Sequence, residues 1–163
     1  GETSEGLKQP SFMLPKTMDG SFEEAFPEIV AFVDKNYRTQ AKKSSRAIAG
    51  LSMGGFHAMH ISKENADMFD YVGLFSAAVF RGDAATSSVY ADMEQKLKVQ
   101  FAKRPRLYWI AIGDKDFLYE ENVRYRALLD AEGYDYQYFE SGDGHVWKNW
   151  RIYLSKFVPM LFK

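Results

Sequence analysis

One short motif constrains the fold of this chain more than any other feature, because it fixes both a turn and the elements on either side. Residues 50–54 read Gly-Leu-Ser-Met-Gly, which matches the pattern G-x-S-x-G. Where that pattern follows a buried strand and opens a helix, it forms a sharp turn that exposes the hydroxyl of the central serine. The strand-like run 46–49, which is apolar from Ala47 onward, comes directly before the motif, and helical spacing of apolar residues continues over 56–63. We therefore expect a strand, this turn and a helix in immediate succession, with Ser52 at the apex.

The two glycines of the motif, Gly50 and Gly54, are expected to be steric requirements of the turn. A side chain at either position would collide where strand and helix cross closely, and only glycine adopts strained backbone angles at low cost. The sequence thus predicts that both positions need glycine.

Downstream of the turn, apolar strand-like runs alternate with helical patterns. Strands are predicted at 46–50, 71–76, 107–112 and 134–139, and helices at 54–65, 89–103, 120–132 and 147–162. Strands this apolar, separated by helices, are typical of a parallel sheet that is covered on both faces. The predicted fold class is α/β: one domain over 21–163 with about four parallel strands and helices on both faces, after an irregular lead-in at 1–20.

A helix is also predicted before the first strand, from about Ser21 to Tyr37. Ser21 and Glu24 have the spacing of a capping box. Pro27 conflicts with a regular helix that begins at Phe22, so either the helix begins later, with Pro27 in its first turn, or it is kinked. Its buried stripe is expected to consist of Ile29, Val30, Phe32 and Val33.

Composition excludes several classes of function. The chain has 163 residues and is 46% hydrophobic, which is enough for a globular core. A net charge of −1 without any basic block gives no support to nucleic-acid binding or to electrostatic attachment to membranes. No apolar run approaches the roughly 20 residues that span a bilayer. The chain contains no cysteine, which excludes disulfides, thiol catalysis and cysteine-based zinc sites.

Residues that could activate Ser52 follow two of the later strands. A serine hydroxyl is unreactive until a neighbouring imidazole takes its proton, and a carboxylate holds that imidazole in place. In α/β-hydrolases these partners follow the serine in the order Asp or Glu, then His, each just after a strand. Asp114 and Asp116 come directly after the strand at 107–112, and His145 comes after the next one. Because catalytic groups collect outside the carboxyl ends of parallel strands, these residues are expected to converge.

The other two histidines are poorer candidates for the base. His57 and His60 lie on the helix that leaves the turn, and that helix carries their side chains away beneath Ser52. We expect them in helix packing or at the surface.

Among the carboxylates, Asp116 is preferred because it lies further into the loop beyond its strand. Asp114 is assigned to an Asx-type turn or a helix cap. Asp143 is a third candidate, but it is so close to His145 in sequence that it is expected to shape the turn instead.

Three segments together carry a resemblance to a known family. They are residues 47–55, residues 71–77 and the run Gly-His-Val-Trp-Lys-Asn-Trp-Arg at 144–151. They resemble the esterase-D-like α/β-hydrolases, and most of all the group of feruloyl esterases and acetyl-xylan esterases. The resemblance extends from the helix at 26–37 to the end of the chain.

The resemblance implies a serine carboxylesterase that hydrolyses carbohydrate-linked acyl esters, of the feruloyl or acetyl type, through an acyl-enzyme. It implies Ser52 as nucleophile, Asp116 as acid and His145 as base, with the backbone N–H of Met53 as one donor of the oxyanion hole. Thioester hydrolysis, siderophore-ester hydrolysis and acyl transfer stay open within the same chemistry. No metal and no cofactor are expected. The partner is a small-molecule or polysaccharide-linked ester, with neither nucleic acid nor membrane.

Two tryptophans flank the predicted base. Trp147 is expected near the substrate, whereas Trp150 is expected to pack within the last helix. The resemblance also favours a secreted or periplasmic location, and a start at Gly1 rather than Met is expected of a processed or engineered chain.

One departure from the family concerns the front of the fold. Family members carry further strands before the serine strand, and a loop there supplies a second oxyanion donor. Only residues 1–45 precede that strand here, and they contain no HGGG-like loop. Loss of one oxyanion donor typically costs about 10² to 10³ in rate. The strand at 46–50 would also expose an open apolar edge.

The alternative function follows from that departure. It is a catalytically impaired half-domain that acts as an interaction module or needs a complementing N-terminal half. A homodimer is the other expected way to cover the open edge.

Overall fold

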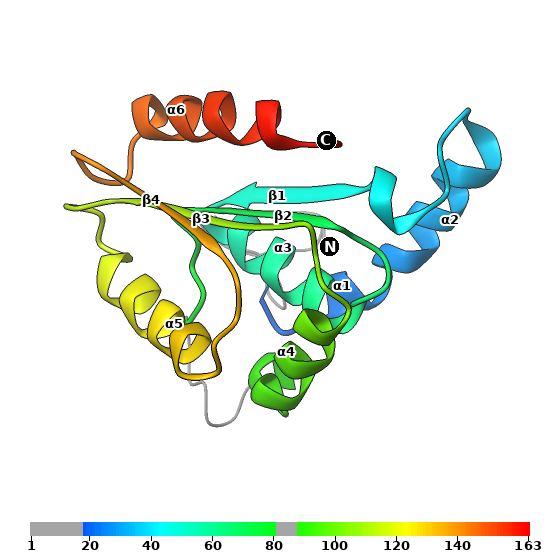
Figure 1. Cartoon of the computed structure of the whole chain (residues 1–163), viewed down its shortest axis with the longest axis horizontal. Helices are drawn as coiled ribbons and strands as arrows, with labels where there is room; N and C mark the ends of the chain where they lie inside the picture. Colours follow the sequence, from blue (N-terminus) through cyan, green and yellow to red (C-terminus); the bar gives the residue numbers. More distant parts are fainter. Residues whose placement is uncertain (1–17, 81–87) are drawn as a thin grey trace, which may run out of the picture.

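The described residues form a sheet of four parallel strands that lie in sequence order. The computed structural model describes residues 18–80 and 88–163, so most of the expected lead-in at 1–20 lies outside the described residues. Figure 1 shows the sheet edge-on. Its strands are β1 (Ala47–Leu51), β2 (Tyr71–Phe75), β3 (Leu107–Gly113) and β4 (Gln137–Ser141). They lie in the order β1-β2-β3-β4, and each neighbouring pair is parallel.

Helices cover both faces of this sheet, as predicted. One face carries α6 (Trp147–Phe157), and the other carries α3 (Met53–Glu64), α4 (Met93–Ala102) and α5 (Tyr119–Ala131) (Figure 1). Alternate residues of a strand point to opposite faces, so β3 contributes to two separate cores. Tyr108 and Ile110 belong to the core beneath α3, α4 and α5, whereas Trp109 packs with the residues of α6.

The element boundaries differ from the predicted ones mainly at β4 and α4. Tyr134 does not extend β4, because its ring stacks on Phe101 of α4, with 4.3 Å between ring centroids. The strand therefore begins three residues later than predicted, at Gln137. The segment predicted to open α4 forms a separate 3₁₀ turn at Ser88–Tyr90, and α4 itself begins at Met93.

The predicted helix before the first strand is divided in two. The first part is α1 (Ser21–Glu24) and the second is α2 (Phe26–Asn36), with Pro27 in the first turn of α2, as one of the two alternatives required. The predicted capping box is wrong, because Ser21 lies inside α1 and Gly20 precedes the helix with a φ of 96°. The backbone N–H and the hydroxyl of Ser21 both donate to Asp19 Oδ1, at 3.0 and 2.7 Å.

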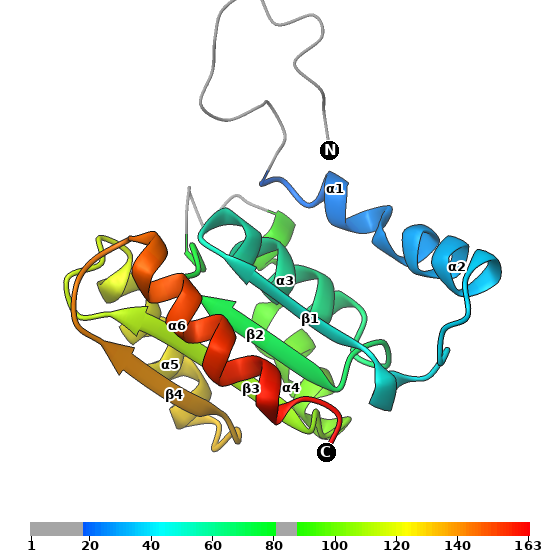
Figure 2. The same ribbon diagram turned by 90° about the horizontal axis from the view of Figure 1, so that it is seen from above.

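The predicted burial of α2 is also wrong. Ile29, Phe32 and Val33 are 46%, 61% and 38% exposed, and we call these three residues the α2 apolar face. The helix lies on the β1 side of the molecule and points away from the sheet (Figure 2). Its contacts with the rest of the described chain include the Phe26 ring against Phe69 and the Asp34 carboxylate against Arg46. Three of the four residues predicted to be core are thus exposed, and the fourth, Val30, is half-buried.

Candidate active site

The serine of the motif occupies a strained turn between β1 and α3. β1 ends at Leu51 and α3 begins at Met53, which leaves Ser52 alone at the apex. Its backbone angles are φ 55° and ψ −119°, and a positive φ is uncommon for any residue other than glycine. The Ser52 N–H donates to Phe75 O at 2.9 Å, and Ser52 O accepts from Ala78 N–H at 3.0 Å. The end of β2 therefore holds the turn in a conformation that costs energy on its own.

The glycines of the motif are not equivalent. A Cβ added at Gly50 would lie 2.0 Å from Gly54 O, so the backbone crossing there admits no side chain. A Cβ added at Gly54 meets nothing within 4 Å, so the expected steric need for glycine at that position is wrong. The tight contact falls one residue later, where a Cβ on Gly55 would lie 2.5 Å from Ala77 Cβ. The strained backbone angle also belongs to Ser52 rather than to either glycine of the motif.

The structure brings the three predicted site residues together. His145 Nε2 lies 2.9 Å from Ser52 Oγ, and His145 Nδ1 lies 2.9 Å from Asp116 Oδ2 and 3.0 Å from Oδ1. A carboxylate accepts only, so Nδ1 carries its proton toward Asp116 and Nε2 is left to accept from the serine hydroxyl. These contacts join residues from the loops after β1, β3 and β4, which end at the same edge of the sheet.

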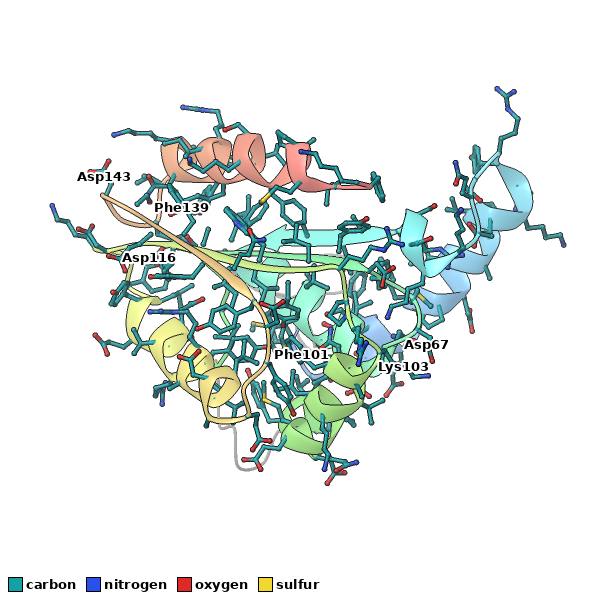
Figure 3. The ribbon with its side chains drawn as sticks, viewed as in Figure 1. Asp67, Phe101, Lys103, Asp116, Phe139 and Asp143 are labelled. Atoms are coloured by element: carbon teal, nitrogen blue, oxygen red, sulfur yellow. The ribbon has the colours of Figure 1, made fainter. Side chains whose placement is uncertain are left out.

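Burial separates the carboxylate of Asp116 from solvent. Asp116 is buried, and its Oδ1 also accepts from Leu118 N–H at 3.0 Å. Figure 3 shows Asp116 below the loop that carries Asp143, near the start of α6. The Asx-type contact that the sequence assigned to Asp114 is thus made by Asp116. A buried ionised carboxylate requires charged or hydrogen-bonding partners, which the imidazole and the backbone supply.

Hydrogen bonds and close packing hold the loop that carries His145 in place. Asn149 is buried, and its Nδ2 donates to Gly142 O at 2.9 Å and to Gly144 O at 3.0 Å. The end of β3 packs directly on the same loop, because a Cβ on Gly113 would lie 2.1 Å from Asp143 O. Asp143 has a φ of 69°, so it shapes this turn as expected. Lys148 lies 2.8 Å from the Asp143 carboxylate and holds its pKa below the usual value.

Aromatic rings surround the imidazole of His145. The Phe117 ring lies 4.6 Å from it and the Trp150 ring 4.9 Å, measured between centroids. Trp150 Nε1 donates to Ser76 Oγ at 3.2 Å, so its role extends beyond the predicted packing within α6. Trp147 packs edge to face on Trp150, at 5.1 Å. Sequence reasoning missed Phe117, although its place directly after Asp116 was a usable signal.

The remaining predicted residues lie as follows. Met53 is the first residue of α3, and the N–H groups of a first helical turn have no partner within the helix. His57 contacts Glu23 of α1, and His60 is buried beside Phe56. Both histidines therefore serve in helix packing, away from the Ser52 hydroxyl.

Residues 18–80 and 88–163 contain neither a cluster suited to a metal ion nor a helix suited to span a membrane. No group of three or more His, Asp or Glu side chains there is arranged to hold a metal ion. No helix in that part of the chain combines the length and the apolar character needed to cross a bilayer.

Comparison with known proteins identifies relatives of this fold and sequence. The family model described as "Putative esterase" matches residues 25–161. An endo-1,4-beta-xylanase/feruloyl esterase of Xylanibacter ruminicola is 31% identical over 136 residues, which cover 83% of this chain and 17% of that protein. An acetyl esterase of Caldicellulosiruptor saccharolyticus is 28% identical, with 83% of this chain and 61% of that protein covered.

Solved structures agree with these sequence matches. A ferulic acid esterase superposes with a TM-score of 0.68 at 25% identity, covering 83% of this chain and 59% of that one. The ferulic acid esterase of Anaeromyces mucronatus in complex with ferulic acid superposes with a TM-score of 0.75 at 19% identity, covering 99% and 61%. The second likeness concerns the fold alone, and together the two confirm the predicted class of α/β fold. The chain spans less than two thirds of the length of each of these four relatives.

Proposed function

This chain belongs to the esterase family, as its motifs predicted, and from that premise we propose that it hydrolyses carboxylic esters by a serine mechanism. Its substrates are carbohydrate-linked acyl groups of the feruloyl or acetyl type. One observation carries the proposal: the Ser52 hydroxyl, on a strained turn, lies 2.9 Å from His145 Nε2, whose other ring nitrogen faces the buried Asp116.

In the proposed reaction, His145 Nε2 takes the Ser52 proton as Ser52 Oγ attacks the ester carbonyl carbon. The same proton passes from Nε2 to the oxygen of the leaving alcohol as the carbon–oxygen bond breaks, which leaves an acyl-enzyme. Water then repeats the sequence and releases the acid. Asp116 holds the Nδ1 proton and stabilises the imidazolium during both steps.

The N-terminus of α3 supports charge stabilisation in the proposed reaction. The Met53 N–H follows the nucleophile directly and begins α3, and the positive end of a helix dipole favours a developing oxyanion. We assign Met53 N–H as one donor of the oxyanion hole. Trp147, exposed beside the His145 loop, is assigned to substrate contact.

Two of the matched relatives support the feruloyl and acetyl types of acyl group. One matched protein is a xylanase/feruloyl esterase and another is an acetyl esterase. Because feruloyl and acetyl groups differ greatly in size, the two can be separated by rate. The measurement is kcat/KM for ethyl ferulate and for ethyl acetate.

A fluorophosphonate probe tests the mechanism without knowledge of the substrate. Such probes label a serine only when a base activates it, so the unsubstituted chain should be labelled and Ser52→Ala should not. Ser88→Ala is the control, because Ser88 lies at the start of a 3₁₀ turn and donates to Asp19 O. Equal labelling of Ser52→Ala and the unsubstituted chain would refute the assignment of the nucleophile.

The second candidate is a half-domain that needs a complementing partner or serves as an interaction module. The observation that favours it is the α2 apolar face together with β1, whose only strand neighbour among the described residues is β2. The test adds a separately produced N-terminal portion of the acetyl esterase relative. A large gain in Ser52-dependent hydrolysis supports complementation, whereas full activity of the chain alone contradicts it.

A further inference from the structure

Two exposed aromatic rings lie near the base of the candidate site, one in a loop and one at the start of a helix. Phe117 follows Asp116 in the loop after β3, and Trp147 begins α6 after the loop that follows β4. Each is 66% exposed, although both are large and apolar. Val146, next to Trp147, is exposed as well. Exposed apolar side chains that gather beside a reactive group mark a contact surface for a ligand. We call Phe117 and Trp147 the aromatic platform.

Contacts with the site fix the position of both rings. Phe117 packs on the His145 imidazole at 4.6 Å, and Trp147 packs on Trp150 at 5.1 Å. Trp150 in turn contacts the same imidazole at 4.9 Å and is anchored by its hydrogen bond to Ser76. Rings that are already held in place lose little conformational entropy when a ligand packs on them.

The chemistry of the proposed reaction decides which part of the substrate meets these rings. The leaving oxygen must receive its proton from His145 Nε2, so it passes within hydrogen-bond distance of the imidazole. The carbonyl oxygen instead turns toward the N-terminus of α3. Side chains that pack around His145 therefore border the leaving alcohol, and those near Met53 border the carbonyl.

Resting on the proposed function, we propose that the aromatic platform binds a sugar ring of the leaving alcohol. The C–H groups on one face of a pyranose form a flat apolar surface that packs on an aromatic ring, while its hydroxyls stay in water. An exposed platform suits such a ligand, because a polysaccharide keeps most of its polar surface solvated. Phe117 and Trp147 are thus specificity residues for the alcohol side of the ester.

Rates on three esters test this assignment. Acetylated xylobiose and ethyl acetate share the acyl group, whereas ethyl ferulate and ethyl acetate share the alcohol. Phe117→Ala and Trp147→Ala should each lower kcat/KM for acetylated xylobiose by about two- to tenfold more than for ethyl acetate. Ethyl ferulate should follow ethyl acetate. Phe117→Tyr and Trp147→Phe keep a flat ring and should recover most of the loss.

Tyr37→Ala is the matched control, since Tyr37 is also 66% exposed but follows α2, away from the sheet. It should leave the ratio of kcat/KM for acetylated xylobiose to kcat/KM for ethyl acetate unchanged. Equal losses on all three esters, or a loss confined to ethyl ferulate, would overturn the platform while the esterase proposal stands.

A binding measurement separates failure of the platform from failure of the proposed function. Xylohexaose is titrated into Ser52→Ala by calorimetry, which requires no turnover. Saturable binding that weakens with Phe117→Ala and Trp147→Ala, but not with Tyr37→Ala, supports the platform even in a chain without esterase activity. Absence of binding to an otherwise folded Ser52→Ala overturns it.

Discussion

The backbone crossing at Gly50 leaves no room for a side chain, whereas Gly54 faces open space. Gly50→Ala places its Cβ against the Gly54 carbonyl and must shift backbone, so it should lower the free energy of unfolding by about 2–4 kcal/mol. Gly54→Ala, within α3, should change it by less than about 1 kcal/mol and in the stabilising direction. Urea unfolding of both variants measures the difference, and similar losses would contradict the steric account.

Ser52 and His145 are expected to act as one unit. Removal of either side chain should lower kcat by nearly the same factor, and removal of both should lower it little further. The reason is that Ser52 attacks the ester only when His145 takes its proton. We expect Ser52→Ala, His145→Ala and the double variant each to lose about 10⁴-fold or more in kcat on 4-nitrophenyl acetate. Losses that add in the double variant would show that the two residues work separately.

His60 predicts a dependence of stability on pH. Burial lowers its pKa below the ordinary 6.5, and the charge of Lys63 adds to this effect. The other charged groups that face it are Glu64, Glu23 and Lys96. His60 in the unfolded chain therefore binds its proton more tightly than in the folded chain. The contribution of neutral His60 to stability is fully present at a pH above its pKa in the unfolded chain. It is lost as the pH falls through its lower pKa in the folded chain.

Thermal unfolding at about pH 7.5 and about pH 5.5 tests that dependence. His60→Gln removes the titrating group, so its Tm should fall by a few degrees less than that of the unsubstituted chain between the two conditions. Parallel falls in Tm would assign the acid sensitivity to other groups.

At the scale of elements, the loop between β4 and α6 depends on one side chain. Asn149 donates to two carbonyls of that loop, and its loss would remove both of these hydrogen bonds. Asn149→Ala should lower the free energy of unfolding by about 1–3 kcal/mol. It should also reduce kcat, because His145 would no longer be held in place. Lys148→Ala removes an exposed ion pair from the same loop and should leave both quantities unchanged. If both variants behaved alike, the loop would not depend on Asn149.

Strand positions could be predicted from the sequence because burial leaves a direct mark on composition, whereas the order of the strands in the sheet was not predicted. β2 and β3 are buried along their whole length, and their apolar runs locate them within a residue. The ends of β4 could not be found in this way, because Tyr134 and Tyr136 suit a strand as well as a loop that covers the core. In α2 the apolar spacing predicted a helix correctly, but spacing does not reveal what covers the apolar face.

The part of the candidate site that could be predicted is the part specified by the order of residues along the chain and by their places after strands. Order and strand ends were enough to select Ser52, Asp116 and His145. Phe117 and Trp150 were harder, because an aromatic residue has the same composition signal in a core as beside an imidazole. The place of Phe117 directly after Asp116 indicated that it lies near the site, but the contact of each ring with the imidazole depends on how the segments after β3 and β4 meet.

At the scale of the whole molecule, the described residues leave apolar surface on the β1 side. The α2 apolar face is exposed there, and β1 has an unpaired edge within the described part of the chain. Unpaired strand edges and apolar patches promote association. We expect the 163-residue chain to form a dimer or larger species at micromolar concentration, measured by size-exclusion chromatography with light scattering.

Matched valines test where that association occurs. Val33→Asp places a charge on the α2 apolar face, whereas Val99→Asp places one on α4, where Val99 is exposed to a similar degree. Val33→Asp should shift the chain toward monomer, and Val99→Asp should not. A monodisperse monomer in the unsubstituted chain would contradict the expectation and would show that the open edge is tolerated.

The sequential strand order has a consequence for synthesis on the ribosome. Each strand pairs with the one made just before it, so the sheet can grow at a single edge as the polypeptide emerges. Ser52 enters its turn early, yet its imidazole partner arrives only after β4 has been translated. In the proposed mechanism, a nascent chain would thus carry Ser52 before the imidazole that activates it, and the serine would stay unreactive until His145 has been made after β4.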